Sequence, residues 1–220
     1  RDSIMFLIPT PSGSRQKVSK MVTTIDQADL AALLRRPGVA SSDFDLNKAL
    51  LPGTNHPLRP AGVLVPIQET AAGLRLILTK RSSALKHHPG QIAFPGGRVD
   101  PTDKNHVDAA LREAHEEIGL PPSRVEVLGH LPPHQTVTQF EMFPVLGWIR
   151  GDFTAIPEAG EVSEVFDIPL FHVLNPNNYF IQSRRWRGQV RSFYTVPYGP
   201  YYIWGATARI LRVLAERVAG

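Results

Sequence analysis

Three glutamates lie close together near the middle of this 220-residue chain, in the segment R-E-A-H-E-E. They are Glu113, Glu116 and Glu117, and on an α-helix they would fall within an arc of roughly 100°. Carboxylates this close repel one another by about 0.2–0.5 kcal/mol per pair. A divalent cation that prefers oxygen ligands, such as Mg²⁺ or Mn²⁺, would remove this repulsion. The spacing therefore predicts a metal site, and a solvated acidic face balanced by Arg112 is the alternative.

The residues around these glutamates carry the signals of a helix with defined ends. Asn105 is a good N-cap with Asp108 three residues on, and Gly119 is followed by two prolines that stop a helix. Apolar residues recur between these ends at helical spacing and predict a buried stripe. They are Val107, Leu111, Ala114 and Ile118. We expect the three glutamates to lie well away from this stripe.

The composition is that of a globular protein with one sizeable core, at 42% hydrophobic and 20% charged residues. There are no cysteines, which excludes disulfides and thiolate metal sites and is compatible with a reducing cytoplasm. The net charge of +4 suits anionic ligands such as phosphates, but the scattered basic residues do not indicate nucleic acid. No apolar run reaches the roughly 18–20 residues of a membrane span. We expect a cytoplasmic protein without a membrane partner.

Sequence patterning predicts a single domain over residues 21–220, preceded by a disordered leader or extension at 1–20. Helices are expected at 26–36, 105–119, 169–174 and 203–218, with a short one at 45–50. Hairpins are expected at 62–67 with 74–80 and at 179–183 with 190–196, and further strands at 91–97, 125–131, 136–150 and 161–166. Strands outnumber helices and the two are interspersed. The fold class is therefore α/β, with a mixed, partly antiparallel sheet covered by helices on both faces.

The acidic helix and the loop before it resemble the Nudix box, G-x5-E-x7-R-E-U-x-E-E-x-G-U, in which U is aliphatic. Gly97 matches the first glycine, and the residues from Arg112 to Leu120 match the tail. Two departures stand out. Asp103 takes the place of the first glutamate, and eight residues rather than seven separate it from Arg112.

These departures are also found in the Nudix coenzyme A pyrophosphatases, whose signature the preceding residues resemble. L-T-K-R-S at 78–82, Lys86, Gly90 and F-P-G-G at 94–97 carry that likeness, although the subgroup usually has Arg at the position of Lys86. The resemblance covers roughly residues 61–214. It implies a Nudix-type α/β/α sandwich that uses Mg²⁺ or Mn²⁺ to hydrolyse coenzyme A or its derivatives to 3′,5′-ADP and (acyl-)4′-phosphopantetheine.

The resemblance also assigns roles to particular residues. The metal ligands would be Glu113, Glu116 and Glu117 with the backbone carbonyl of Gly97, and Arg112 would hold Glu116 in its metal-binding pose through an ion pair. Family members take the general base either from the box or from a later loop. The candidates on later segments are Glu161, Glu164 and Glu141. For the extra 3′-phosphate of coenzyme A, the basic residues that lead into the box are Arg81, Lys86, His87 and His88.

Two other segments have structural interpretations. The Arg184–Arg187 cluster with Trp186 is typical of a charged hairpin tip, and the aromatic run 198–204 is expected in the core, where Tyr201 or Tyr202 could also support an adenine. H-E-E-I-G lacks the second histidine of a zinc-protease motif. The expected partner is a small-molecule substrate, bound by a monomer or homodimer. The alternative functions are hydrolysis of ADP-ribose, NADH or another nucleoside diphosphate derivative, and nucleotide sensing without turnover.

Overall fold

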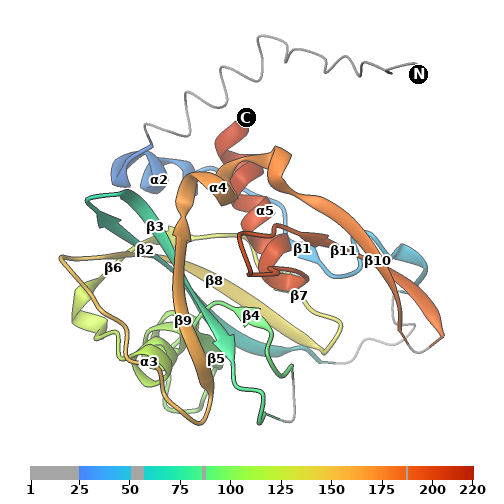
Figure 1. Cartoon of the computed structure of the whole chain (residues 1–220), viewed down its shortest axis with the longest axis horizontal. Coiled ribbons are helices and arrows are strands. Elements are labelled where there is room, and N and C mark those ends of the chain that lie inside the picture. The colour runs from blue at the N-terminus through green and yellow to red at the C-terminus, as the bar shows by residue number, and fades with distance from the viewer. Residues whose placement is uncertain (1–24, 51–56, 86–87, 187) are drawn as a thin grey trace, which may run out of the picture.

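The structure is a computed structural model that describes residues 25–50, 57–85, 88–186 and 188–220 (Figure 1). The predicted extension at 1–20, together with Lys86, His87 and Arg187, lies outside the described residues. Within them, a mixed sheet is covered by helices on both faces, as the sequence predicts. The proposed start of the domain at residue 21 stays a prediction.

The elements fall close to their predicted positions. The strands of the main sheet are β1 (Ser41–Ser42), β2 (Arg59–Thr70), β3 (Gly73–Arg81), β4 (Ile92–Ala93), β5 (Gly96–Arg98), β6 (Val125–His130), β7 (His134–Gln135), β8 (Phe140–Ile149) and β9 (Val162–Pro169). A separate hairpin consists of β10 (Phe180–Trp186) and β11 (Gln189–Thr195). The α-helices are α2 (Gln27–Leu34), α3 (His106–Ile118), α4 (Leu170–Leu174) and α5 (Ala206–Ala219). Single 3₁₀ turns occur at Lys48–Leu50, Pro122–Arg124 and Pro176–Asn178, and the first of these replaces the short helix predicted at 45–50.

Strands β2 and β3 are paired at one end only. At the other end, the glycine-rich segment F-P-G-G at 94–97 lies between them. β2 and β3 pair only next to their turn, from Ile67 with Leu76 to Thr70 with Gly73. Farther from the turn, β5 pairs with the first half of β2 and β4 pairs with the last residues of β3. The far edge of β2 pairs in parallel with β8, and β9 runs antiparallel to β3. The predicted hairpin is confirmed, but it is paired over a shorter length than expected.

The two faces of the sheet have separate cores. Side chains of β2 alternate between them, so Leu64 points to α3 while Val63 and Val65 point to the opposite face. The α3 face is closed by Ile77, Ala110, Ala114, Ile118, Val145 and Ile149. The other face is covered by α2, α4 and α5 through Leu30, Leu33, Leu170, Leu174, Leu211 and Leu214. This two-sided packing holds α3 against the strands that carry the glycine-rich segment.

Gly62 determines how closely α3 approaches β2. A Cβ atom at this position would lie 2.1 Å from the carbonyl oxygen of His106 and 2.8 Å from the amide nitrogen of Ala110. Both are backbone atoms of α3, so the helix itself would have to shift to accommodate any side chain. The glycine therefore fixes the height of the acidic helix above the sheet.

The ends of α3 follow the sequence signals. Asn105 Oδ1 accepts hydrogen bonds from the backbone N–H groups of Val107 (2.8 Å) and Asp108 (3.1 Å), and Gly119 ends the helix with φ of 69°. The predicted separation of the glutamates from the buried side was wrong for Glu117, which is only 4% exposed. The helix packs beside β5 as well as on β2, and this second contact buries Glu117.

Candidate active site

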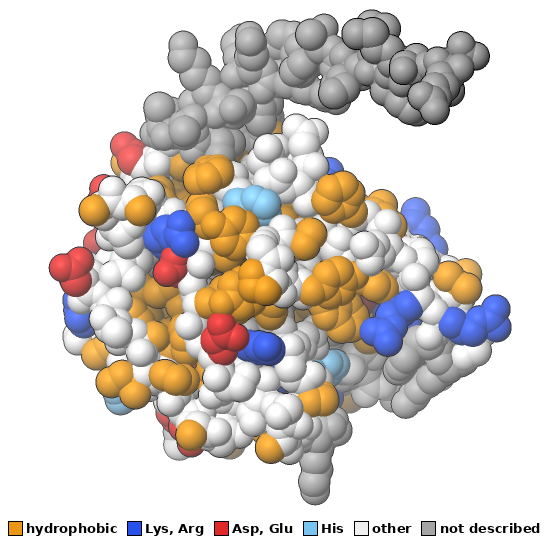
Figure 2. Space-filling view, viewed as in Figure 1, with side chains coloured by type: hydrophobic (Ala, Val, Ile, Leu, Met, Phe, Trp, Pro, Cys, Tyr) orange, Lys and Arg blue, Asp and Glu red, His pale blue; other side chains and the backbone are white. Residues whose placement is uncertain are grey.

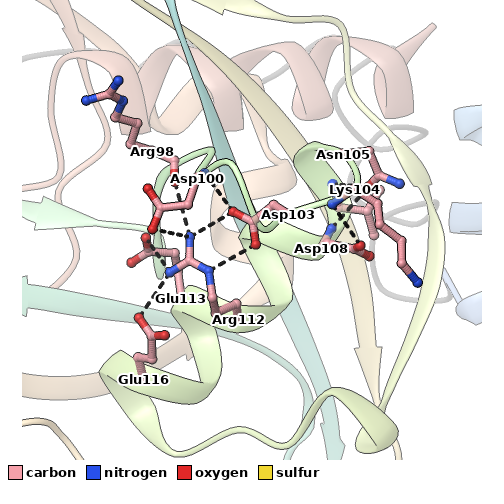
Figure 3. A network of polar contacts seen from close by, with 10 residues as sticks. Arg98, Asp100, Asp103, Lys104, Asn105, Asp108, Arg112, Glu113 and Glu116 are labelled. Atoms are coloured by element: carbon pink, nitrogen blue, oxygen red, sulfur yellow. Dashed lines mark hydrogen bonds and ion pairs between the residues drawn. The ribbon is translucent and has the colours of Figure 1, made fainter.

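An arginine near the middle of α3 is the centre of a network of carboxylates (Figure 3). Arg112 binds Asp103 through two parallel contacts, Nε–Oδ1 at 3.0 Å and Nη2–Oδ2 at 2.9 Å. Its Nη1 donates to Glu113 Oε1 (3.0 Å) and to Glu116 Oε2 (3.1 Å). Its Nη2 also donates to the carbonyl oxygen of Arg98 (3.2 Å). One guanidinium thus ties β5 and the following loop to the helix that carries the glutamates.

Asp103 is the strongest partner of Arg112. Its side chain is only 5% exposed, and the bidentate contact lowers the pKa of the Asp103 carboxyl while raising the pKa of Arg112. A tight turn fixes the aspartate, because Asp103 Oδ2 accepts from the N–H of Asp100 (2.8 Å) and Asp103 N–H donates to the carbonyl of Asp100 (3.0 Å). Asp103 in place of glutamate and the extra residue before Arg112, the two departures from the family pattern, therefore affect the same ion pair. The shorter Asp side chain reaches Arg112 from a loop that is one residue longer.

Asp103→Asn is expected to lower kcat/KM by about 10–100-fold, the usual cost of losing a group that orients the residues at a metal site. The amide cannot accept both arginine contacts, so Arg112 would lose its bidentate contact with the loop that follows β5. Asp108→Asn is the matched control, because the Asp108 carboxylate lies in the first turn of α3 and accepts from Lys104 N–H. Steady-state kinetics of both variants test the role. Equal activity of the two would remove Asp103 from the positioning network.

Glu117 is the most deeply buried of the three glutamates. Its Oε2 accepts a hydrogen bond from the N–H of Gly96 on β5 (3.2 Å). The pKa of its carboxyl is raised to about 8, chiefly by burial and also by the carboxylates of Glu113 and Glu161. The hydrogen bond from Gly96 N–H and the charge of Arg81 act in the opposite direction. Burial also raises the pKa of Glu113. These mutual effects mean that Glu161 and Arg81, both distant in sequence, lie within electrostatic reach of the helix carboxylates.

Gly97 faces one of these glutamates directly. A Cβ atom at Gly97 would lie 2.4 Å from Oε1 of Glu113, so only glycine allows this carboxylate to lie against the backbone of β5. A side chain at this position would therefore displace the Glu113 carboxylate. The packing also brings the peptide group of Gly97 next to the carboxylate cluster.

The donor set suits a hard divalent cation by its chemistry. All candidate donors are oxygens, and the buried Glu117 carboxylate carries a raised pKa that a nearby cation would lower. Among the described residues, no three His, Asp or Glu side chains are grouped closely enough to hold a metal ion as they stand. Instead, Glu113 and Glu116 share Nη1 of Arg112, and Glu116 is 56% exposed. The oxygen donors of these side chains fit a hard divalent ion by their chemistry.

The segment before β9 positions Glu161 beside the helix. Glu158 N–H donates to the carbonyl oxygen of Glu117 (2.9 Å), and the Glu158 carboxylate accepts from the N–H groups of Gly160 and Glu161. The carbonyl of Glu161 in turn accepts from Ser82 N–H (2.8 Å), next to Arg81. Sequence reasoning did not single out Glu158. The only hint of this turn in the local sequence was Gly160, two residues after Glu158.

The other two candidate bases are placed differently. The carboxylate of Glu164 accepts a hydrogen bond from the hydroxyl of Tyr201 (2.6 Å) and lies 3.9 Å from Lys80 Nζ. Glu141 lies on β8, which pairs with the edge of β2 opposite to β5. Of the three, Glu161 is the one whose charge acts on both Glu113 and Glu117. The geometry therefore favours Glu161 over Glu164 and Glu141.

A second polar cluster resembles a nucleophilic triad but is closed to solvent. Ser41 Oγ and His134 Nδ1 are 2.9 Å apart, and His134 Nε2 lies 3.3 Å from Asp43 Oδ1. Ser41 is 4% exposed and His134 is fully buried. The hydroxyl therefore cannot meet a substrate, and the cluster serves to fasten β1 to β7.

Comparisons with a family model and with curated proteins give the same description. A family model described as the NUDIX domain matches residues 58–185. A protein called "Uncharacterized Nudix hydrolase NudL" from Enterobacter sp. (strain 638) is 44% identical over 161 residues, which cover 73% of this chain and 83% of that protein. A protein of the same name from Escherichia coli (strain K12) is 44% identical over 165 residues, which cover 74% and 84%.

Solved structures give weaker matches. A MutT/nudix family protein from Enterococcus faecalis is 15% identical with a TM-score of 0.46, covering 95% of this chain and 75% of the other. A C. elegans Ap4A hydrolase binary complex is 19% identical with a TM-score of 0.44, covering 50% of this chain and 80% of the other.

Proposed function

This chain belongs to the Nudix hydrolase family, and from that premise we propose that it cleaves the pyrophosphate bond of coenzyme A or a coenzyme A derivative. As a Nudix diphosphatase it hydrolyses a diphosphate linkage in a small-molecule substrate. The names of the relatives specify no substrate. The proposal therefore rests on the residues around the site.

The main support for the proposal is that the coenzyme A-like signature lies close to the carboxylates of the acidic helix. Arg81 belongs to that signature, and its charge lowers the pKa of Glu117. Among the described residues of the signature stretch 78–97 are the end of β3, all of β4 and the start of β5, and β5 packs against the acidic helix. The segment that resembles the coenzyme A signature thus lies close enough to the acidic helix for the charge of Arg81 to act on Glu117.

Nudix hydrolases use divalent metal ions, and we propose Mg²⁺ or Mn²⁺ here, held by Glu113, Glu116, Glu117 and the carbonyl of Gly97. A bound ion would supply charge neutralisation to the phosphoryl oxygens. Arg112 donates hydrogen bonds to Glu113 and Glu116 and keeps these two carboxylates oriented.

The chain's own residues supply the remaining roles in the proposed reaction. Arg81 donates hydrogen bonds to the pyrophosphate, and Glu161 takes a proton from the attacking water. The water oxygen bonds to one phosphorus while the bond from that phosphorus to the bridging oxygen breaks. The products are 3′,5′-ADP and 4′-phosphopantetheine, or its acylated form. Lys86, the second predicted substrate-binding residue, lies outside the described residues.

A product assay tests the proposal directly. Purified protein is incubated with Mg²⁺ or Mn²⁺ and equimolar coenzyme A, ADP-ribose and NADH, and the products are separated by chromatography. We expect 3′,5′-ADP to accumulate first, and protein carrying Glu117→Gln controls for contaminating hydrolases. Faster release of AMP from ADP-ribose would replace coenzyme A with another nucleoside diphosphate derivative. Absence of any product would favour a nucleotide-sensing module.

Other expectations about the protein's surroundings stay predictions. In the part of the chain that the structure describes, no helix is long and apolar enough to cross a membrane. We propose a cytoplasmic monomer or homodimer that acts on small molecules and does not bind nucleic acid.

A further inference from the structure

The β10–β11 hairpin and the loop that follows it carry an aromatic and basic surface that the proposed mechanism does not use. We call it the hairpin surface and define it by Gln182, Arg184, Phe193, Tyr202 and Trp204. Gln182 lies directly opposite Phe193 across the two strands, and Arg184 is two residues along β10 on the same face. Figure 2 shows hydrophobic side chains gathered over the middle of this view, with Lys and Arg side chains beside them toward the hairpin.

The contacts within this surface leave an aromatic face and a cation available together. The rings of Phe193 and Trp204 pack with centroids 5.1 Å apart, and the guanidinium carbon of Arg184 lies 5.9 Å from the centroid of the Trp204 ring. The hydroxyl of Tyr202 donates to Gln182, and the Tyr202 side chain is 43% exposed. Trp204 is half-buried and Arg184 is exposed. The tryptophan is therefore supported by Phe193, lies next to the guanidinium of Arg184 and remains partly exposed.

The charges on the hairpin favour an anion. Arg184 lies directly opposite Arg191 in the antiparallel register, and like charges at such positions repel. Arg191 lowers the pKa of Asp43, so part of its charge is compensated by that carboxylate. Arg184 contacts the face of Trp204 instead of a carboxylate. A phosphate beside Arg184 would relieve the repulsion and receive a charge-assisted hydrogen bond.

A short chain of contacts links this surface to the active site. Gly205 follows Trp204, and a Cβ atom on Gly205 would lie 3.8 Å from Nε2 of Gln91. The carbonyl of Gln91 accepts from the N–H of Arg81 (2.9 Å), whose side chain acts on Glu117. The same loop is also fastened to β9, where the rings of Tyr201 and Phe166 stack at 3.6 Å. These contacts connect the loop that carries Tyr202 and Trp204 to β9 and, through Gln91, to Arg81.

We propose that the hairpin surface binds the 3′-phosphoadenosine end of the substrate, with adenine on Trp204 and the 3′-phosphate on Arg184. This inference rests on the proposed coenzyme A activity and adds a specificity site to it. Aromatic rings stack on nucleobases, and arginine recognises phosphate through its planar fork. Because Arg81 is near Glu117, it suits the pyrophosphate, which leaves the 3′-phosphate to a second cation. Arg184 supplies that cation.

The test compares two substrates that differ only in the 3′-phosphate. Arg184→Ala is expected to raise KM for coenzyme A about tenfold or more, with kcat and the KM for dephospho-coenzyme A little changed, because a charged hydrogen bond is lost. Trp204→Leu, which keeps an apolar side chain against Phe193, should raise KM for both substrates. Arg185→Ala is the matched control, since Arg185 is the next residue on β10 and lies on the opposite face.

Binding of 3′,5′-ADP, measured by calorimetry, provides a readout without turnover. We expect the wild-type protein to bind 3′,5′-ADP more tightly than 5′-AMP, and Arg184→Ala to abolish the difference. Unchanged KM values and unchanged binding in both hairpin variants would overturn the inference while leaving coenzyme A hydrolysis intact. Hydrolysis of ADP-ribose in preference to coenzyme A would instead overturn the proposed function. Preferential binding of an RNA oligonucleotide to the hairpin would also contradict the nucleotide site.

Discussion

Glu117→Gln is expected to lower kcat by at least about 100-fold while the protein remains folded, as for the loss of a metal ligand. The substitution keeps the shape of the side chain and an oxygen that can accept the hydrogen bond from Gly96 N–H. It removes the negative charge that a divalent ion would require. The effect should therefore fall on metal binding and turnover rather than on packing.

The buried position of Glu117 gives this variant a second signature. Because burial raises the pKa of the carboxyl to about 8, the folded metal-free protein holds a proton that the unfolded chain releases at lower pH. The free energy of unfolding of the metal-free wild type should therefore decrease as pH rises from the ordinary glutamate pKa toward about 8. Glu117→Gln lacks this contribution, so at pH 8 its metal-free form should be at least as stable as the wild type.

Thermal unfolding with and without Mg²⁺ or Mn²⁺ separates these effects. The metal should raise the Tm of the wild type, since a ligand that binds only the folded state stabilises it, and should raise the Tm of Glu117→Gln less. Glu126→Gln is the control, because Glu126 lies on β6 and pairs with Arg150 at the surface. Near-normal turnover and an unchanged metal-dependent Tm shift in Glu117→Gln would exclude Glu117 from the metal site.

Local signals in the sequence were sufficient to locate the acidic helix. Asn105 and Gly119 act through their own backbone conformation and nearest neighbours, so their effects can be read without knowing the rest of the fold. The apolar, β-branched run at 62–67 likewise predicts a strand, and in the structure its side chains alternate between the two cores.

Features that depend on distant contacts could not be read in this way. The burial of Glu117 follows from the position of β5, and β5 lies beside the helix only because β2 and β3 separate beyond their turn. A helical projection of the sequence has one buried face, whereas α3 packs against two partners. The same limit applies to Asp103, whose pairing with Arg112 spans nine residues and a turn.

The choice between Glu161 and Glu164 shows this limit most clearly. Both glutamates precede or occupy the same strand and are three residues apart, so no local pattern distinguishes them. The distinction comes from Tyr201, which is 37 residues beyond Glu164 and donates a hydrogen bond to it. It also comes from the Glu158 turn, which fixes the backbone of Glu161 beside α3.

Glu161→Gln is accordingly expected to lower kcat by about 10²–10⁴-fold, the usual contribution of a general base. Glu164→Gln is the matched control and should retain most activity, because its carboxylate is already engaged by Tyr201 and Lys80. The pH dependence of kcat gives a further readout. The acidic limb of the wild-type profile, which reports protonation of the base, should be lost from the residual activity of Glu161→Gln.

Comparison of Glu161→Gln, Glu164→Gln and Glu117→Gln identifies the residue that takes the proton from the attacking water. If Glu161→Gln retains most of its activity while Glu117→Gln is inactive, the base must lie within the acidic helix, and Glu116, the most exposed of its three glutamates, becomes the leading candidate. If Glu164→Gln is the more damaged variant, the hydrogen bond to Tyr201 must open when substrate binds. The expected order, with Glu161→Gln far below Glu164→Gln, follows from two observations. Glu161 acts on the pKa of both Glu113 and Glu117, whereas the carboxylate of Glu164 is engaged by Tyr201.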